Sequence, residues 1–226
     1  MKKLILIIAT IFLQNCQSPS KFDLINVKLN KDKISNIIPK GIESNVLDAG
    51  LSGGDYKFSS INSEKILIFD KQNFAGKNPK AYSENNVFFF FNKKDSIVTH
   101  FTLNIYVTKQ SEKLLKTLQN KLGNPNYTGY SFAADKVNNN PSIFMWEDIK
   151  NNTFYHMHYT KQNYGIEATL NVMPIKKVYP GLAGITYWES FTYQRNKRKD
   201  SNYTYQQFII DKTKKDSDNF YNILSK

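Results

Sequence analysis

Three residue types that often carry chemistry or cross-links are scarce in this chain of 226 residues. It has one cysteine and three histidines, and its 31 basic residues include only two arginines, Arg195 and Arg198. A single cysteine excludes an internal disulfide and a cysteine-rich zinc site. Three histidines restrict the forms of acid–base catalysis and metal binding that the chain can support. The position of the one cysteine therefore becomes the most informative feature.

The net charge of the chain is +12, because 31 basic residues face 19 acidic ones. A charge of this sign and size is typical of proteins that bind nucleic acid or an anionic surface. Nearly all of it comes from lysine, whereas arginine is suited to bidentate contacts with phosphates and guanine. We therefore predict no nucleic-acid partner, and the charge would fit anionic lipid headgroups or acidic glycans. A solvated basic surface explains the same composition.

The first fifteen residues have the pattern of an export signal. Two lysines follow the first methionine, residues 4–13 form an unbroken and mostly apolar run, and Gln14 and Asn15 are polar. A basic start, an apolar run of about 7 to 15 residues and a polar boundary are typical of a secretory signal peptide. The run is too short for a bilayer-spanning helix, which needs roughly 20 residues. We predict that residues 1–15 are a signal peptide.

The cysteine follows directly, in Leu13-Gln14-Asn15-Cys16, which resembles the lipobox of bacterial lipoproteins. Leu13 matches the family pattern, whereas Asn15 stands where a small residue normally precedes the cysteine. The resemblance implies cleavage before Cys16, diacylglycerol on its thiol and a fatty-acyl chain such as palmitate on its amine. Several such chains, at about 0.8 kcal/mol per buried CH2, hold a protein on a membrane. A free cysteine near an ordinary cleavage site is the alternative.

The residue after the cysteine bears on where such a lipoprotein is retained. In this family an aspartate there retains the protein at the inner membrane of Gram-negative bacteria, but this chain has Gln17. No acidic cluster follows of the kind that directs some lipoproteins to the cell surface. The resemblance therefore implies the outer membrane, with the protein facing the periplasm. Residues 16–21 would be the lipidated tether, and residues 22–226 would form a single domain.

The remaining chain predicts an α+β domain with an antiparallel sheet. Apolar and polar residues alternate over 96–107, which is the period of a strand. Turn residues at 92–95 join it to Val87–Phe91, read as a strand buried on both faces, so we predict a hairpin. A three-stranded meander is predicted at 142–147, 153–160 and 166–172. Weaker patterns predict strands at 21–29, 56–61, 65–69 and 185–193, and one or two short helices within 203–224.

One segment, residues 111–122, has a clear helical pattern. Its leucines recur at helical spacing and form one apolar stripe. Ser111 is the predicted N-cap. The stripe must pack on another element, most simply on one face of the sheet, with Leu118 at its centre. Thr117 and Lys121 lie off the stripe and are predicted to face water.

A glycine-rich segment, GLSGGD at 50–55, is the first candidate for chemistry. It resembles the glycine-flanked nucleophile of trypsin-like serine proteases, but Leu51 stands where that family has an aspartate. A triad also needs a histidine base, and none of the three histidines has a recognisable context. A glycine-rich turn explains the same residues. We therefore predict no catalytic residue here or elsewhere.

The second candidate is the pair His156 and His158. On a strand the two side chains would project to the same face, a spacing that can bind zinc if a third ligand such as His100 or Glu147 approaches. The alternating tyrosines and methionine of 155–159 suggest the opposite face as the buried one, which would leave both histidines exposed. We predict no metal and no cofactor.

The third candidate is an aromatic and basic segment near the C-terminus. Aromatic faces beside cations suit sugars or anionic glycans, although they also suit a core with a basic rim. The residues that would bind such a ligand are Tyr187, Trp188, Tyr193, Arg195 and Arg198.

Two classes of function remain open. The first is a membrane-anchored envelope lipoprotein without catalytic activity, a binding or interaction module whose partner is an envelope protein or an anionic glycan. The second is a periplasmic hydrolase with an unrecognised active site. The first is favoured, because no spacing in the sequence places acid–base partners together. An enzyme would be recognised by at least two acidic or histidine side chains in one cleft.

Overall fold

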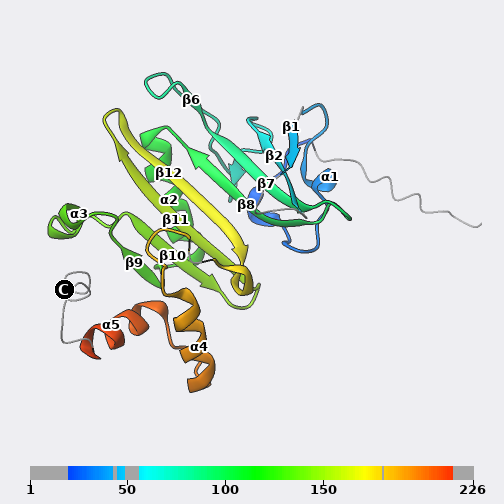
Figure 1. The fold of residues 1–226 in the computed structure, drawn as a ribbon. Helices are drawn as coiled ribbons and strands as arrows, with labels where there is room; N and C mark the ends of the chain where they lie inside the picture. The colour runs from blue at the N-terminus through cyan, green and yellow to red at the C-terminus, as the bar shows by residue number, and fades with distance from the viewer. Residues whose placement is uncertain (1–19, 43–44, 49–55, 180, 216–226) are drawn as a thin grey trace, which may run out of the picture.

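The computed structural model describes residues 20–42, 45–48, 56–179 and 181–215. Cys16 and the segment 50–55 lie outside the described residues. Within them the chain forms an α+β domain around one eight-stranded antiparallel sheet (Figure 1), as the sequence predicts. From one edge to the other the strands are β1 (Asn45–Asp48), β2 (Tyr56–Ile61), β7 (Asn86–Asn92), β8 (Val98–Ile105), β12 (Gly165–Pro174), β11 (Thr153–Gln162), β10 (Ile143–Asp148) and β9 (Tyr127–Gly129).

Both of the predicted strand assemblies are present in this sheet. β7 and β8 form the expected antiparallel hairpin, in which Phe89 lies opposite Phe101. β10, β11 and β12 form the expected meander. The meander joins the hairpin through β12 and β8, where Leu170 lies opposite Leu103. Short hairpins precede β7: β3 (Ile68–Phe69) with β4 (Gln72–Asn73), and β5 (Lys77–Asn78) with β6 (Ser83–Glu84).

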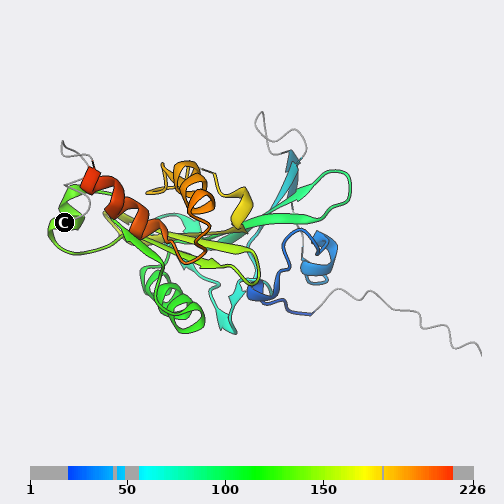
Figure 2. The same cartoon turned by 90° about the horizontal axis from the view of Figure 1, so that it is seen from below.

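Helices cover the two faces of the sheet unequally. Figure 2 shows α2 (Thr108–Leu122) on one side, and α4 (Trp188–Arg198) and α5 (Tyr205–Lys215) on the other. The core under α2 runs across most of the sheet, whereas the core under α4 and α5 involves strand residues from β10, β11 and β12, with Tyr127 of β9 packed against it. The other helices are short: η1 (Leu24–Asn26), α1 (Ile34–Ile37), α3 (Ala133–Val137) and η2 (Ile175–Lys177).

This unequal cover corrects the prediction for the phenylalanine run. β7 was expected to be buried on both faces, but its residues alternate between buried and half-buried. Phe89 and Phe91 face the α2 core, while Phe88 and Phe90 lie on the other face, outside the core under α4 and α5. A continuous apolar run therefore does not require two covered faces.

The helix α2 packs on the sheet as predicted, with Leu118 fully buried. Two details differ. The helix begins at Thr108, so Ser111 is not its N-cap, and the Ser111 hydroxyl hydrogen-bonds to the carbonyl oxygens of Ile105 and Ile166. Thr117 was expected to face water but is only 6% exposed, and its hydroxyl donates to the Lys113 carbonyl. A threonine can satisfy its polar group within its own helix, which permits this burial.

Three weak strand predictions were wrong at least in part. Residues 185–193 belong mostly to α4, because Trp188 and Phe191 are three apart and bury one side of a helix. Residues 21–29 hold η1 instead of a strand, since the Asp23 carboxylate accepts the backbone N–H groups of Ile25 and Asp70. In 65–69 only the last two residues are in a strand.

Candidate functional site

The histidine pair of β11 lies on the face toward α4 and α5, not on an exposed face. His156 is 1% exposed, and its Nε2 lies 2.8 Å from the carbonyl oxygen of Ala183. Burial lowers the pKa of His156 to about 4, so the ring is neutral at pH 7 and donates from Nε2. The prediction that His156 is exposed is therefore wrong, because the segment before α4 covers this face.

His158 has a different neighbour. Its Nε2 lies 2.8 Å from the hydroxyl of Ser131. Neither His100 nor Glu147 joins the two rings: His100 stacks on Phe90, and Glu147 pairs with Arg195. Among residues 20–42, 45–48, 56–179 and 181–215, no three histidine, cysteine or acidic side chains form a cluster that could hold a metal ion.

The five residues predicted for ligand binding separate into three environments. Trp188 is only 2% exposed and lies in the core under α4 and α5, where it contacts Phe154 and Phe191. Tyr187 packs against the same core, and its backbone N–H donates to the hydroxyl of Tyr205. Tyr193 is 68% exposed and points away from this core.

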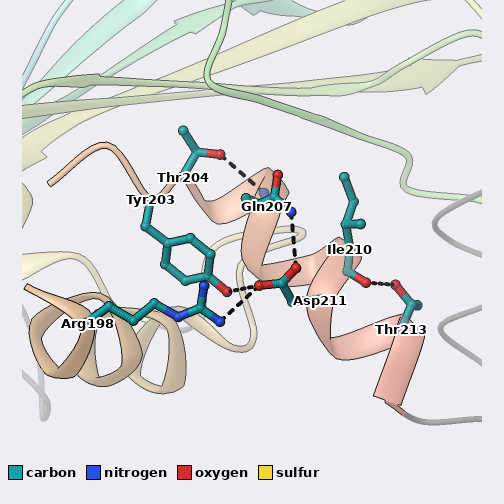
Figure 3. Close-up of polar contacts among 7 residues, drawn as sticks. All are labelled: Arg198, Tyr203, Thr204, Gln207, Ile210, Asp211 and Thr213. Atoms are coloured by element: carbon teal, nitrogen blue, oxygen red, sulfur yellow. Dashed lines mark hydrogen bonds and ion pairs between the residues drawn. The ribbon is translucent and has the colours of Figure 1, made fainter. Parts of the chain in front are cut away.

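Both arginines contact other side chains within the fold. Arg198 lies 3.9 Å from the ring centre of Tyr203, and its Nη2 lies 3.0 Å from a carboxylate oxygen of Asp211 (Figure 3). Hydrogen bonds from Gln207 and Tyr203 to the same carboxylate, together with Arg198, lower the pKa of Asp211. This cluster ties α4 to α5.

Arg195 forms a more buried pair. Its Nη1 lies 2.6 Å from Oε2 of Glu147, with side-chain exposures of 15% and 6%. The guanidinium also lies 4.5 Å from the ring centre of Phe191. The pair joins α4 to the end of β10, so the position of α4 over the sheet depends on it.

Beside this ion pair lies the largest of the described cavities, a groove of about 1100 Å³ between α4, η2 and the β10–β11 turn. Ile149, Ile175, Val178 and Trp188 form its apolar part. Its polar and charged lining consists of Asn152, Lys176, Glu189, Thr192, Arg195, Asn196, Lys199, Asp200 and Ser201. Two of the predicted residues, Trp188 and Arg195, therefore border the groove, and the other three do not.

The sequence contains a helical spacing that could have predicted the other groove residues of α4. The α4 members lie at 188, 189, 192, 195 and 196, which is one face of a helix, and Lys199 is the C-cap. Interpreting 185–193 as a strand placed Glu189 on the opposite face from Trp188 and Thr192. Asn152 and Lys176 come from other turns, and only the meander brings these turns next to α4.

A second, smaller cavity of about 320 Å³ lies between α2 and the segment that joins β9 to β10. Its apolar lining is Leu115, Phe132, Pro141, Tyr159 and Ile166, and Ser142 borders it. Phe132 is 66% exposed at its rim. Of the hydrogen-bonded side chains Ser131, Ser142 and His158, only Ser142 lines this cavity.

Comparisons with known proteins found no match: no family model, curated protein or solved structure matches the chain. Among the helices of the described residues, none is both long and apolar enough to cross a membrane.

Proposed function

We propose that this protein is a lipid-anchored binding or interaction protein of the bacterial cell envelope, held by Cys16 and binding its ligand in the groove beside α4. The observation that carries the binding proposal is the groove itself. Ligand sites are typically concave, of about 300 to 1000 Å³, and combine apolar walls with a few polar groups. At about 1100 Å³ the groove lies just above this range, and its lining combines apolar and polar groups in this way. The anchor rests on the lipobox resemblance, which lies outside the described residues.

The lining of the groove supports binding better than catalysis. No histidine borders it, and Arg195 is already held by Glu147. Lys176 and Lys199 are exposed cations on its rim, opposed by Glu189 and Asp200. An envelope protein or an anionic glycan with an apolar portion would fit this mixture of charges and the apolar surface around Trp188.

Site-specific photocrosslinking in the native envelope tests this proposal. A photoreactive phenylalanine analogue replaces the exposed Asn196 in the groove, and a matched variant carries it at the exposed Lys28, whose neighbours Val27 and Leu29 pack against the core under α2. We expect a discrete adduct, a protein or a glycan by mass, at Asn196 and not at Lys28. The same adducts at both positions, or none at Asn196, would refute the groove as the binding site.

The second candidate, a periplasmic hydrolase, is not favoured by the groove. A hydrolase of the serine class needs a nucleophile within hydrogen-bond reach of a base. Among the hydrogen bonds of the described residues, one joins a serine hydroxyl to a histidine ring, and neither of its two residues lines the groove.

A further inference from the structure

Three side chains form a continuous chain of hydrogen bonds at the β9 edge of the sheet. The hydroxyl oxygen of Ser131 lies 2.8 Å from Nε2 of His158 and 2.8 Å from the hydroxyl oxygen of Ser142. The backbone N–H of Ser131 donates to the Ser142 hydroxyl over 2.8 Å. Because this oxygen accepts from the backbone, Ser142 can donate to Ser131, and Ser131 can donate to His158.

The sheet brings these residues together. His158 lies on β11 directly opposite Ile143 of β10, and Ser142 immediately precedes Ile143. Ser131 follows the short strand β9, which pairs with β10 at the edge of the sheet (Figure 1). Ser131 and His158 are both half-buried. The Ser131 oxygen is therefore held in place but is not enclosed by the core.

The histidine is in the state that a general base needs. Burial lowers the pKa of His158, so the ring is neutral at pH 7. With Nδ1 protonated, the lone pair of Nε2 points to the Ser131 hydroxyl. A nucleophile and a base at 2.6 to 3.2 Å are the geometry of an activated serine.

We propose that Ser131 is a nucleophile activated by His158, and that this site accepts the acyl group of an ester. The site is separate from the groove beside α4, so the proposal goes beyond the binding function. Ser142, which is hydrogen-bonded to Ser131, lines the cavity of about 320 Å³. The walls of this cavity are apolar at Leu115, Phe132, Tyr159 and Ile166, which suits a short acyl chain, and Glu112, Lys116, Asp135 and Lys161 also line it.

The chemistry balances without a cofactor. The Ser131 oxygen adds to the carbonyl carbon of the ester, and its proton passes to Nε2 of His158. The bond from carbon to the alcohol oxygen then breaks, and that oxygen takes the proton from His158, which leaves the acyl group on Ser131. Water adds to the same carbon with His158 again as base, the bond to Ser131 breaks, and the proton returns to Ser131 as the acid departs.

The described residues place no carboxylate on Nδ1 of His158, so the pair is a dyad. Ser142 orients Ser131 instead, through its hydrogen bonds to the Ser131 backbone N–H and hydroxyl. A dyad without this carboxylate is expected to turn over slowly. Covalent modification of Ser131 is therefore a more sensitive measurement than the turnover of an ester.

The test uses the full-length protein, purified from membranes in detergent, and a fluorophosphonate carrying a short alkyl chain. We expect one label per chain, mapped to Ser131 by peptide mass spectrometry, with the rate of labelling rising as pH increases through the pKa of His158. His158→Gln should lower that rate on the order of a hundredfold. Ser131→Ala should abolish it, while Ser190→Ala, which alters an exposed serine of α4, should react as the wild type does.

Two outcomes would overturn the proposal: no labelling of the wild-type protein, or labelling at a residue other than Ser131. Mapping the label on the wild type does not depend on whether a variant folds. The result is also independent of the photocrosslinking at Asn196, because the two sites share no residues.

Discussion

His100 and His156 are both neutral at pH 7 in the folded protein, His156 fully buried and His100 half-buried. His156 donates to Ala183 on the α4 side of the sheet, and His100 stacks on Phe90 with their ring centres 4.2 Å apart. Burial lowers the pKa of each to about 4, with Lys177 adding to the effect at His100. Protonation of either ring would place an unpaired charge in the protein.

The stability should therefore fall in mild acid. Unfolded histidine has a pKa near 6.5, so below that pH the unfolded chain binds more protons than the folded one, down to about pH 4. We expect the free energy of unfolding to be constant above about pH 7.5 and to decrease between 6.5 and 4, by at most about 1.4 kcal/mol per pH unit for each ring. Urea unfolding at several pH values measures this. A double variant, His100→Gln with His156→Gln, should show a smaller decrease in the free energy of unfolding per pH unit. An equal decrease in the double variant and the wild type would contradict the lowered pKa values of the two rings.

A second prediction concerns the ion pair of Glu147 and Arg195. Removing one partner of a buried pair leaves the other charge without compensation, which typically costs about 3 to 5 kcal/mol. We expect Glu147→Gln to lower the free energy of unfolding toward the lower end of this range. Lys77→Gln is the matched control, because it breaks an exposed pair with Glu84 and should cost about 1 kcal/mol or less. Similar losses in the two variants, measured by urea unfolding, would mean that Glu147 is effectively solvated.

At the scale of elements, α2 is the helix that the sequence predicts most directly. Leu114 and Leu118 are fully buried, whereas Leu115 and Leu122 are half-buried at the margins of the stripe. The buried Thr117 shows that the buried face is wider than the leucine stripe alone. The leucine pattern therefore identifies the direction of the buried face, and the packing partner decides its width.

The stability of α2 on the sheet can be measured with two substitutions. Leu118→Ala should lower the free energy of unfolding by about 2 to 5 kcal/mol, because it leaves a cavity in the core. Lys121→Ala should cost about 1 kcal/mol or less, since Lys121 is exposed and pairs with Asp70 at 3.2 Å near the surface. Equal midpoints and slopes of the urea unfolding transition for the two variants would contradict the packing of α2 on the sheet.

At the scale of the whole molecule, the proposed anchor and the folded domain are separate features. The domain provides both cavities, and no described helix could cross a membrane. In the proposed function, attachment to the envelope depends on the lipid on Cys16. Three acyl chains would be more than the two signals that stable anchoring needs.

Lipidation is tested by growing cells that express the protein with an alkyne fatty acid. We expect the wild-type protein to be labelled and to begin at Cys16, and we expect Cys16→Ser to remain unlabelled and to leave the membrane fraction. Ser18→Ala, two residues away, is the control and should be labelled as the wild type is. Equal labelling of the wild type and Cys16→Ser, or a mature protein that begins elsewhere, would rule out this anchor.

The local pattern of the sequence determined the α+β class, the β7–β8 hairpin, the β10–β12 meander and the burial of Leu118. These features follow from period-two alternation, turn residues and helical spacing, which act between neighbours in the chain. The proposed lipid site at Cys16 rests on sequence alone. Trp188 and Arg195 were predicted as ligand-binding candidates in the same way, because an aromatic and basic segment is visible without a fold, and both line the groove.

Only the tertiary structure decided which faces are covered and which residues meet. Residues 188–193 are part of a helix instead of a strand because Trp188 and Phe191 have a sheet face to pack on. His156 is buried because α4 and the segment before it cover that same face. The contacts between Glu147 and Arg195 and between Ser131 and His158 join residues 48 and 27 positions apart. Such pairs have no signature in local spacing, since their distance depends on how the strands and helices pack.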